Sequence, residues 1–246
     1  MSWVYAYAYR AGADHARCDD VCVCETLGDT IIAAVSDGAG SAEKGRIGAS
    51  LACDAFVELG VQIFSGTIQP PCLLEAIRAR IPEGESDAYS CTLVGVVAGP
   101  GGAMLLQVGD GAAVIKTDPT AGAGLHRPAD PDGPPYELVA WPEETEFLNH
   151  TFFVTAHDAG SHLRVHHVHG RIGEFALFTD GLQHLVLDRK TKTPHQPFFR
   201  TIFKPLADKP EHDIKSSWWL ERQLGSDHVT KRTDDDTSIV IARRLM

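Results

Sequence analysis

Four short acidic motifs lie where strand-like segments of this sequence begin or end. They are Cys18-Asp19-Asp20, Ser36-Asp37-Gly38, Thr179-Asp180-Gly181 and Asp234-Asp235-Asp236. Because the ends of strands can meet at one edge of a sheet, the carboxylates of these motifs could form a single cluster. Two like charges 4 Å apart repel by about 4 kcal/mol at an effective dielectric constant of 20, so such a cluster requires a cation. Hard oxygen ligands favour Mg²⁺ or Mn²⁺, whereas Zn²⁺ prefers His and Cys.

Each motif also has a simpler interpretation, because the commonest use of an Asp-Gly pair is a tight turn. Taken alone, any one motif favours that turn. The order and spacing of all four together favour the metal site. A further acidic residue, Asp110, lies in the turn Gly109-Asp110-Gly111 between two strand-like segments. It could add a carboxylate to the cluster or only shape its hairpin.

Short apolar runs between turn residues predict strands along most of the chain. They cover residues 4–9, 21–25, 30–36, 90–98, 103–108, 112–116, 151–155, 163–168, 174–179 and 238–243. We expect the first three to share one antiparallel sheet and residues 90–116 to form a meander. Apolar residues at helical spacing predict a helix after Ser41, which could cap it, and further helices at residues 71–81, 197–206 and 212–224.

This order of elements predicts an α+β fold, a four-layer αββα sandwich of two antiparallel sheets flanked by helices. With 246 residues, 43% of them hydrophobic, the chain is expected to form one domain over residues 1–246. Residues 118–135 are dense in Gly, Ala, Pro and Asp, so we expect a flexible loop or lid at about 118–150. Trp218 and Trp219 are interpreted as aromatics of the core or of a lid.

The composition argues against several classes of partner. The formal net charge is −11, and no run of Lys and Arg could follow a nucleic-acid backbone. The N-terminus lacks the pattern of an export signal, and no apolar stretch long enough to span a membrane is evident, so we expect a cytoplasmic protein without a membrane partner. The six cysteines lack metal-site spacing and are expected to be reduced.

Six motifs in this order resemble the type 2C metal-dependent serine/threonine protein phosphatases, and within them a compact bacterial branch. The resemblance covers residues 12–243. The motifs are Cys18-Asp19-Asp20, Ser36-Asp37-Gly38-Ala39-Gly40-Ser41, Gly109-Asp110-Gly111, Phe147-Leu148-Asn149-His150-Thr151, Thr179-Asp180-Gly181-Leu182 and Asp234-Asp235-Asp236-Thr237. The family's fold is a pair of antiparallel sheets between helices, which agrees with the order of elements.

The resemblance implies a binuclear centre of two Mn²⁺ or Mg²⁺ ions. In it, Asp37 would bridge both ions, Asp180 and Asp234 would hold the first, and the carbonyl of Gly38 would bind the second. The ions would share a water, lower its pKa and direct it at the phosphorus of a phosphoserine or phosphothreonine. The implied function is hydrolysis of these groups on proteins.

The resemblance leaves the remaining ligands less specified. Asp19 or Asp20 would complete the shell of the second ion, directly or through water, and Asp20 is favoured. Asp110 occupies a position at which bacterial relatives hold a third, weaker ion. The implied partner is a phosphorylated protein, a cognate Ser/Thr kinase or its target, and the enzyme is expected to be a monomer.

The sequence departs from the family's pattern at two places. Ala39 stands where many members have a His proposed to protonate the leaving group. The Arg that grips the substrate phosphate falls nearest His15, with Arg17 one step beyond; Arg17 is favoured for its bidentate fork. Two other functions therefore stay open, a catalytically silent phosphatase-like binding module and a phosphatase acting on a small phosphorylated metabolite.

Overall fold

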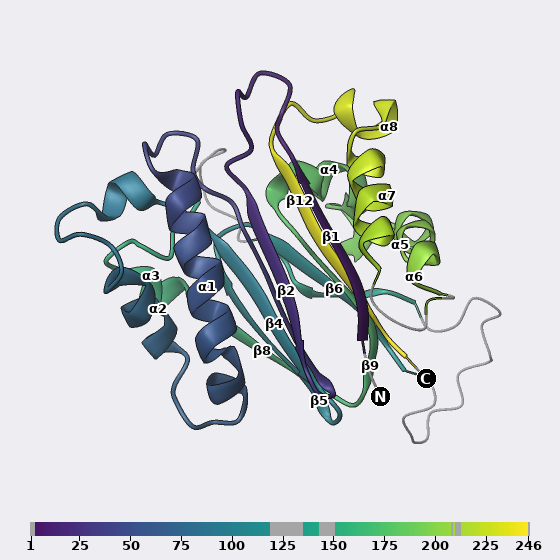
Figure 1. Cartoon of the computed structure of the whole chain (residues 1–246), viewed down its shortest axis with the longest axis horizontal. Coiled ribbons are helices and arrows are strands. Elements are labelled where there is room, and N and C mark those ends of the chain that lie inside the picture. Colours follow the sequence, from purple (N-terminus) through teal and green to yellow (C-terminus); the bar gives the residue numbers. More distant parts are fainter. Residues whose placement is uncertain (1–2, 119–134, 143–150, 208, 210–212, 246) are drawn as a thin grey trace.

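The computed structural model describes residues 3–118, 135–142, 151–207, 209 and 213–245. Two five-stranded antiparallel sheets pack face to face, and helices cover the outer face of each (Figure 1). The predicted layered α+β sandwich is confirmed. The helix-covered faces and the space between the sheets each hold a separate apolar cluster, so the central strands of each sheet are buried on both faces.

Each sheet draws its strands from distant parts of the chain. The first sheet has the order β1 (Trp3–Arg10), β12 (Thr237–Arg244), β9 (Ile172–Phe178), β6 (Ala112–Thr117), β7 (Glu137–Ala140). The second has the order β2 (Val21–Leu27), β3 (Thr30–Ser36), β4 (Leu93–Gly99), β5 (Gly102–Val108), β8 (Arg164–His169). A two-stranded hairpin pairs β10 (Leu187–Asp188) with β11 (Thr193–Pro194).

The helices form the two outer layers. Those beside the second sheet are α1 (Gly45–Phe64), α2 (Pro71–Arg78) and α3 (Ala159–His162), with the 3₁₀ turn η1 (Ser86–Tyr89). Those beside the first sheet are α4 (Gln183–Val186), α5 (Gln196–Ile202), α6 (Lys204–Ala207), α7 (Ile214–Leu224) and α8 (Asp227–Thr230), preceded by the 3₁₀ turn η2 (Asp180–Leu182). The predicted helix at 197–206 is thus divided into α5 and α6.

Strand β12 shows why these strands have apolar residues on both faces. Ile239 and Ile241 pack among the helices of the first sheet, whereas Val240 and Ala242 pack between the two sheets. Alternate residues therefore pack into different cores. For this reason the strand is a continuous apolar run and does not alternate between apolar and polar residues.

Helix α1 packs its apolar face on the second sheet. Phe56 lies so close to β4 that a Cβ atom at Gly95 would stand 2.5 Å from its ring, which explains the glycine in that strand. By length and composition α1 could cross a membrane, which the sequence analysis did not expect. In the structure its residues Ala49, Ala52 and Phe56 are fully buried against the sheet.

Two expectations about strand pairing are wrong. Strand β1 does not join β2 and β3 but pairs with β12 in the other sheet. Strand β6 does not continue the β4–β5 hairpin and instead pairs with β9. The turn at residues 109–111 thus carries the chain from one sheet to the other. The sequence does not indicate this change of sheet, because both strands bury both faces and their residue patterns are alike.

Local details also differ from the sequence-based expectations. Ser41 caps no helix, since α1 begins at Gly45 after turn bonds such as Ala42 N to Ala39 O at 2.8 Å. Residues 151–155 form no strand, although the amide of Val154 donates to the carbonyl of Cys91 at 2.9 Å. All six cysteines are free, as expected. The expected lid lies largely outside the described residues.

Candidate metal centre

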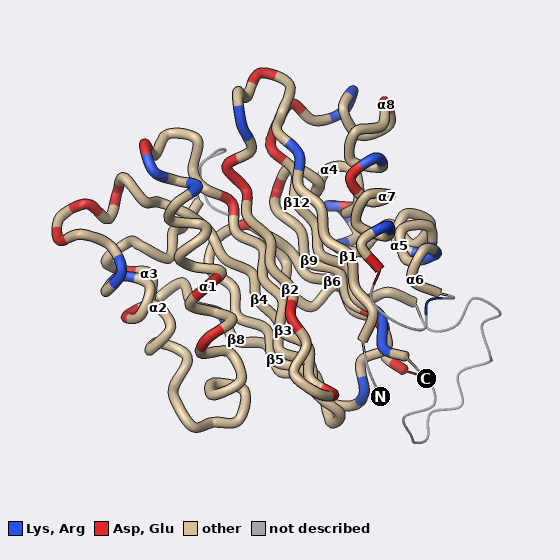
Figure 2. The backbone as a smooth tube through the Cα atoms, in the orientation of Figure 1, with Lys and Arg blue, Asp and Glu red and all other residues tan. Residues whose placement is uncertain are grey.

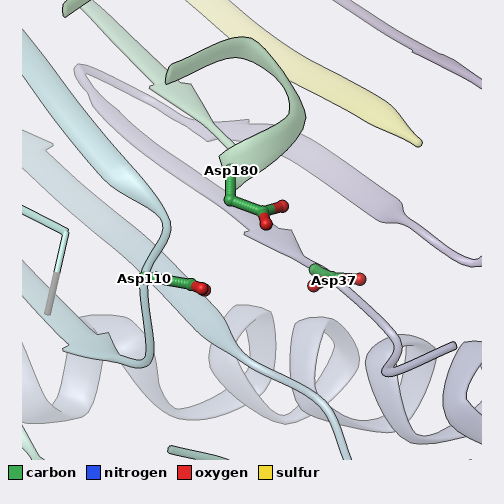
Figure 3. Close-up of side chains that lie close together, drawn as sticks. All are labelled: Asp37, Asp110 and Asp180. Atoms are coloured by element: carbon green, nitrogen blue, oxygen red, sulfur yellow. The ribbon is translucent and has the colours of Figure 1, made fainter. Parts of the chain in front are cut away.

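Three aspartates converge where the two sheets meet at one end of the sandwich (Figure 3). Asp37 follows β3, Asp110 lies in the turn between β5 and β6, and Asp180 follows β9. One carboxylate oxygen from each lies within 4.8 Å of the others. The donors are all hard oxygens on partly buried side chains, so the group fits a divalent cation such as Mg²⁺ or Mn²⁺.

The cluster is electrostatically unfavourable without a cation. Burial raises the pKa of Asp37, and the charges of Asp20, Asp110 and Asp235 raise it further. Burial also raises the pKa of Asp180, with added repulsion from Asp37, Asp110 and Asp235. Such a group of carboxyls is costly to ionise on its own, and a cation would supply the missing charge.

Asp20 belongs to the same charged group. Its side chain is only 1% exposed, and burial raises its pKa to about 8 despite a hydrogen bond from Thr179 Oγ1 to Oδ2 at 2.7 Å. The charge of Asp180 raises this pKa as well. Asp19 instead accepts a hydrogen bond from Arg17 Nε at 2.9 Å. The structure therefore places Asp20 beside Asp37 and Asp180, whereas the carboxylate of Asp19 is paired with Arg17.

Backbone contacts fix the position of Asp37. Its amide donates to Thr92 Oγ1 at 3.1 Å, and its carbonyl accepts from the amide of Thr92 at 2.9 Å. The next residue, Gly38, passes so near the start of α1 that a Cβ atom would lie 2.4 Å from the carbonyl carbon of Gly45. Only glycine fits at this position. Close packing against α1, and not a tight turn, therefore explains the Asp-Gly pair.

Other side chains hold the loops that carry the acidic residues. Arg46, in the first turn of α1, donates to the carbonyls of Cys18 and Asp20. Gln107 donates to the carbonyl of Gly111 at 2.9 Å, and Gln183 donates to that of Asp110. Sequence analysis did not identify these positioning residues, because polar residues inside strands and helices form no motif.

The three consecutive aspartates before β12 have different surroundings. Asp234 is exposed, and its carbonyl accepts from the amide of Ala13 at 3.2 Å. Asp236 is buried, and its carboxylate accepts from the amides of Gly12 and Asp19. Asp235 is exposed like Asp234, but its charge raises the pKa values of the clustered carboxyls. The resemblance to the family had implied that Asp234 is the ligand of the first ion.

The two candidate phosphate-binding residues lie on the loop between β1 and β2. His15 Nδ1 lies 2.7 Å from Asp236 Oδ1, and this hydrogen bond raises the pKa of His15. The Arg17 side chain is 64% exposed and is paired with Asp19. Both could therefore carry positive charge beside the acidic cluster. The Arg17 side chain is the more exposed of the two, whereas His15 is held by its hydrogen bond to Asp236.

The raised pKa values predict how stability depends on pH in chelator. A carboxyl whose pKa rises on folding, from about 3.9 in the unfolded chain, contributes its full stability below the unfolded pKa and loses it progressively as the pH rises to the folded pKa. For Asp20 the folded pKa is about 8, so the melting temperature should fall between about pH 4 and pH 8 and level off above that. In thermal melts Asp20→Asn should flatten this dependence. An equal flattening by Asp54→Asn, an exposed control on α1, would contradict the assignment.

Comparison with known proteins agrees with this geometry. A family model for protein phosphatase 2C matches residues 10–225. Serine/threonine-protein phosphatase 3 of Escherichia coli (strain K12) is 32% identical over 264 aligned residues, covering 98% of each chain. The chain belongs to the protein phosphatase 2C family. It is a protein phosphatase of bacterial type with the fold that the resemblance implied.

Solved structures of protein phosphatase 2C type share the fold at low sequence identity. The serine/threonine phosphatase Stp1 of Staphylococcus aureus superposes with a TM-score of 0.65 at 12% identity, covering 100% of this chain and 96% of that one. PppA of Pseudomonas aeruginosa gives 0.64 at 17%, covering 100% and 99%. RsbX, solved in complex with magnesium, gives 0.58 at 12%, covering 98% and 94%. The family motif at residues 147–151 lies outside the described residues except for Thr151.

Proposed function

We propose that this protein phosphatase hydrolyses phosphoserine and phosphothreonine on proteins through a binuclear metal centre. The observation that supports this most directly is the convergence of Asp37, Asp110 and Asp180 at the junction of the two sheets. When bound, two Mn²⁺ or Mg²⁺ ions would lower the pKa of a shared water and neutralise the phosphoryl oxygens. The relative named as a serine/threonine-protein phosphatase supports the choice of substrate class.

The chain's own residues then have distinct proposed roles. Asp37, fixed by Thr92, would bridge the two ions, and Asp180 would hold the first. We assign to Asp235 the role first expected of Asp234, because its charge reaches the cluster. The Gly38 carbonyl and Asp20 would serve the second position, while Asp19 pairs with Arg17. Asp110 serves a third, weaker ion.

The loop between β1 and β2 would hold the substrate phosphate. Arg17 has an exposed guanidinium that can form two parallel hydrogen bonds with phosphate oxygens. His15, with its pKa raised by Asp236, can add a second positive charge. Ala39 is 8% exposed and carries no proton donor, so the leaving group takes its proton from water or from another residue.

The expected setting is also a proposal. We infer a cytoplasmic, monomeric, single-domain enzyme that acts on a phosphorylated protein, either a cognate Ser/Thr kinase or its target. Phosphatases of this family act on groups made by kinases, so a kinase is the class of enzyme that must supply the substrate.

The test is hydrolysis of a phosphoserine peptide and of an aryl phosphate by chelated and metal-loaded protein. We expect turnover to disappear in chelator and to return with Mn²⁺ or Mg²⁺, because the clustered donors are all oxygens. Calorimetric titration of the chelated protein should show two tight sites. Full turnover in metal-free buffer would contradict the binuclear centre, and hydrolysis of phosphorylated metabolites without phosphopeptides would favour the metabolite phosphatase.

A further inference from the structure

A hollow of about 640 Å³ lies between the end of β1 and the outer face of α7. Its lining consists of one strand residue and four helix residues: Arg10, Lys215, Trp218, Glu221 and Arg222. No role proposed above uses these residues. The hollow is therefore a surface separate from the metal centre.

An exposed tryptophan forms the middle of this hollow. Trp218 is 58% exposed, which corrects the expectation that it packs in the core or under a lid. Leu220 and Leu224, on the other side of α7, are buried and hold the helix on the first sheet. Lys215, Trp218 and Arg222 follow one another at three- and four-residue spacing, so they share one face of the helix. The helix is thus anchored by one face and presents an aromatic ring between two cations on the other.

The hollow is basic in a strongly acidic chain. Its three cations and one anion, Glu221, give a formal charge of +2, against −11 for the whole chain. Among the described residues, the ion pairs join other side chains, and none includes Arg10, Lys215 or Arg222. Figure 2 shows basic segments on α7 and at the neighbouring end of β1, close to loops rich in Asp and Glu. These three cations form no ion pair within the described part of the chain, so they are available to an external anion.

The hollow begins at the catalytic end of the fold. Arg10 is the last residue of β1 and pairs with Thr237, which directly follows the three aspartates. The amide of Gly12, two residues on, donates to Asp236. The Arg10 guanidinium also lies beside the C-terminal end of α7, where it would stand 2.8 Å from a Cβ atom at Gly225. From this end the hollow extends along α7 towards Lys215.

We propose that this hollow binds an acidic segment of the phosphorylated protein substrate, on one side of the phosphorylated residue. This inference rests on the proposed function. The Cα atoms of Lys215 and Arg222 are seven residue steps apart, about 10.5 Å of helix, which three or four residues of an extended peptide would match. Acidic side chains would meet the cations, and the Trp218 ring would cover an apolar part of the peptide. A basic or neutral segment would gain no such contacts.

The first test compares two phosphoserine peptides that differ only in an acidic or a neutral flank. In the double variant Lys215→Glu/Arg222→Glu, the KM for the acidic peptide should rise about tenfold, because attraction becomes repulsion, with kcat unchanged. The KM for the neutral peptide and the turnover of an aryl phosphate should not change. The control Lys190→Glu/Lys231→Glu carries the same change in net charge on exposed residues outside the hollow.

The second test measures binding directly. The unphosphorylated acidic peptide, titrated into the Mn²⁺-loaded protein, should change the fluorescence of Trp218, the most exposed of the tryptophans among the described residues. The change should be absent in Trp218→Phe and should weaken with salt. If no phosphopeptide is hydrolysed but this signal remains, the proposed function fails and docking stands. Hydrolysis without flank preference or fluorescence change would overturn the docking site, as would tighter binding of single-stranded DNA than of the acidic peptide.

Discussion

Replacing Asp37 with Asn is expected to reduce turnover on a phosphoserine peptide on the order of a thousandfold. Its side chain faces those of Asp110 and Asp180, with one carboxylate oxygen of each within 4.8 Å of the others, and we propose that it bridges two cations, as the resemblance to the family implies. Asn keeps the shape but removes the charge that binds them. The contacts that fix this residue run through its backbone to Thr92 and do not depend on the carboxylate. The loss should therefore appear in kcat and in metal affinity, and not in the fold.

Stability separates this effect from unfolding. Removing one charge from a crowded, metal-free cluster relieves repulsion, so Asp37→Asn should melt in chelator at the same temperature as the native protein or higher. Added Mn²⁺ should stabilise the native protein more than the variant. Asp54→Asn, on the exposed face of α1, should change neither quantity. Near-native turnover of Asp37→Asn would remove Asp37 from the centre.

The sequence predicted local structure better than it predicted pairing. The strand at residues 30–36 was located to the residue, because its apolar run ends abruptly at an Asp-Gly pair. The assignment of β1 and β6 to sheets failed, because pairing with β12 and β9 depends on contacts between segments far apart in the chain. The interpretation of Trp218 failed for a related reason. Helical spacing shows that residues share a face, but it does not show that this face is covered.

The candidate site was predictable to the level of motifs. Asp37 and Asp180 precede glycines that end strand-like segments, and the structure places both at the same end of the sandwich. The sequence alone does not show whether Asp234 or Asp235 faces the cluster, because three consecutive residues of the same type lie in one turn. The distinction depends on the buried Asp236, which takes the amides of the β1–β2 loop and so fixes the direction of its neighbours.

Asp235→Asn is expected to reduce turnover at least about a hundredfold, whereas Asp234→Asn should stay within a few fold of the native enzyme. Loss of a residue that only orients a metal ligand typically costs 10–100-fold, and a direct ligand should cost no less.

The two aspartates differ in whether their charge affects the clustered carboxyls. The charge of Asp235 raises the pKa values of Asp37 and Asp180, so it is felt by the residues that would hold the ions. Asp234 and Asp235 are both exposed, but the contact seen for Asp234 is made by its backbone carbonyl, which accepts from the amide of Ala13, and an Asn side chain leaves that contact intact. The two substitutions are chemically identical and adjacent, so each serves as the control for the other. Calorimetry with Mn²⁺ should show weakened binding in Asp235→Asn alone. If Asp234→Asn were instead the defective enzyme, with Asp235→Asn near native, the ligand would be Asp234 as the sequence first indicated.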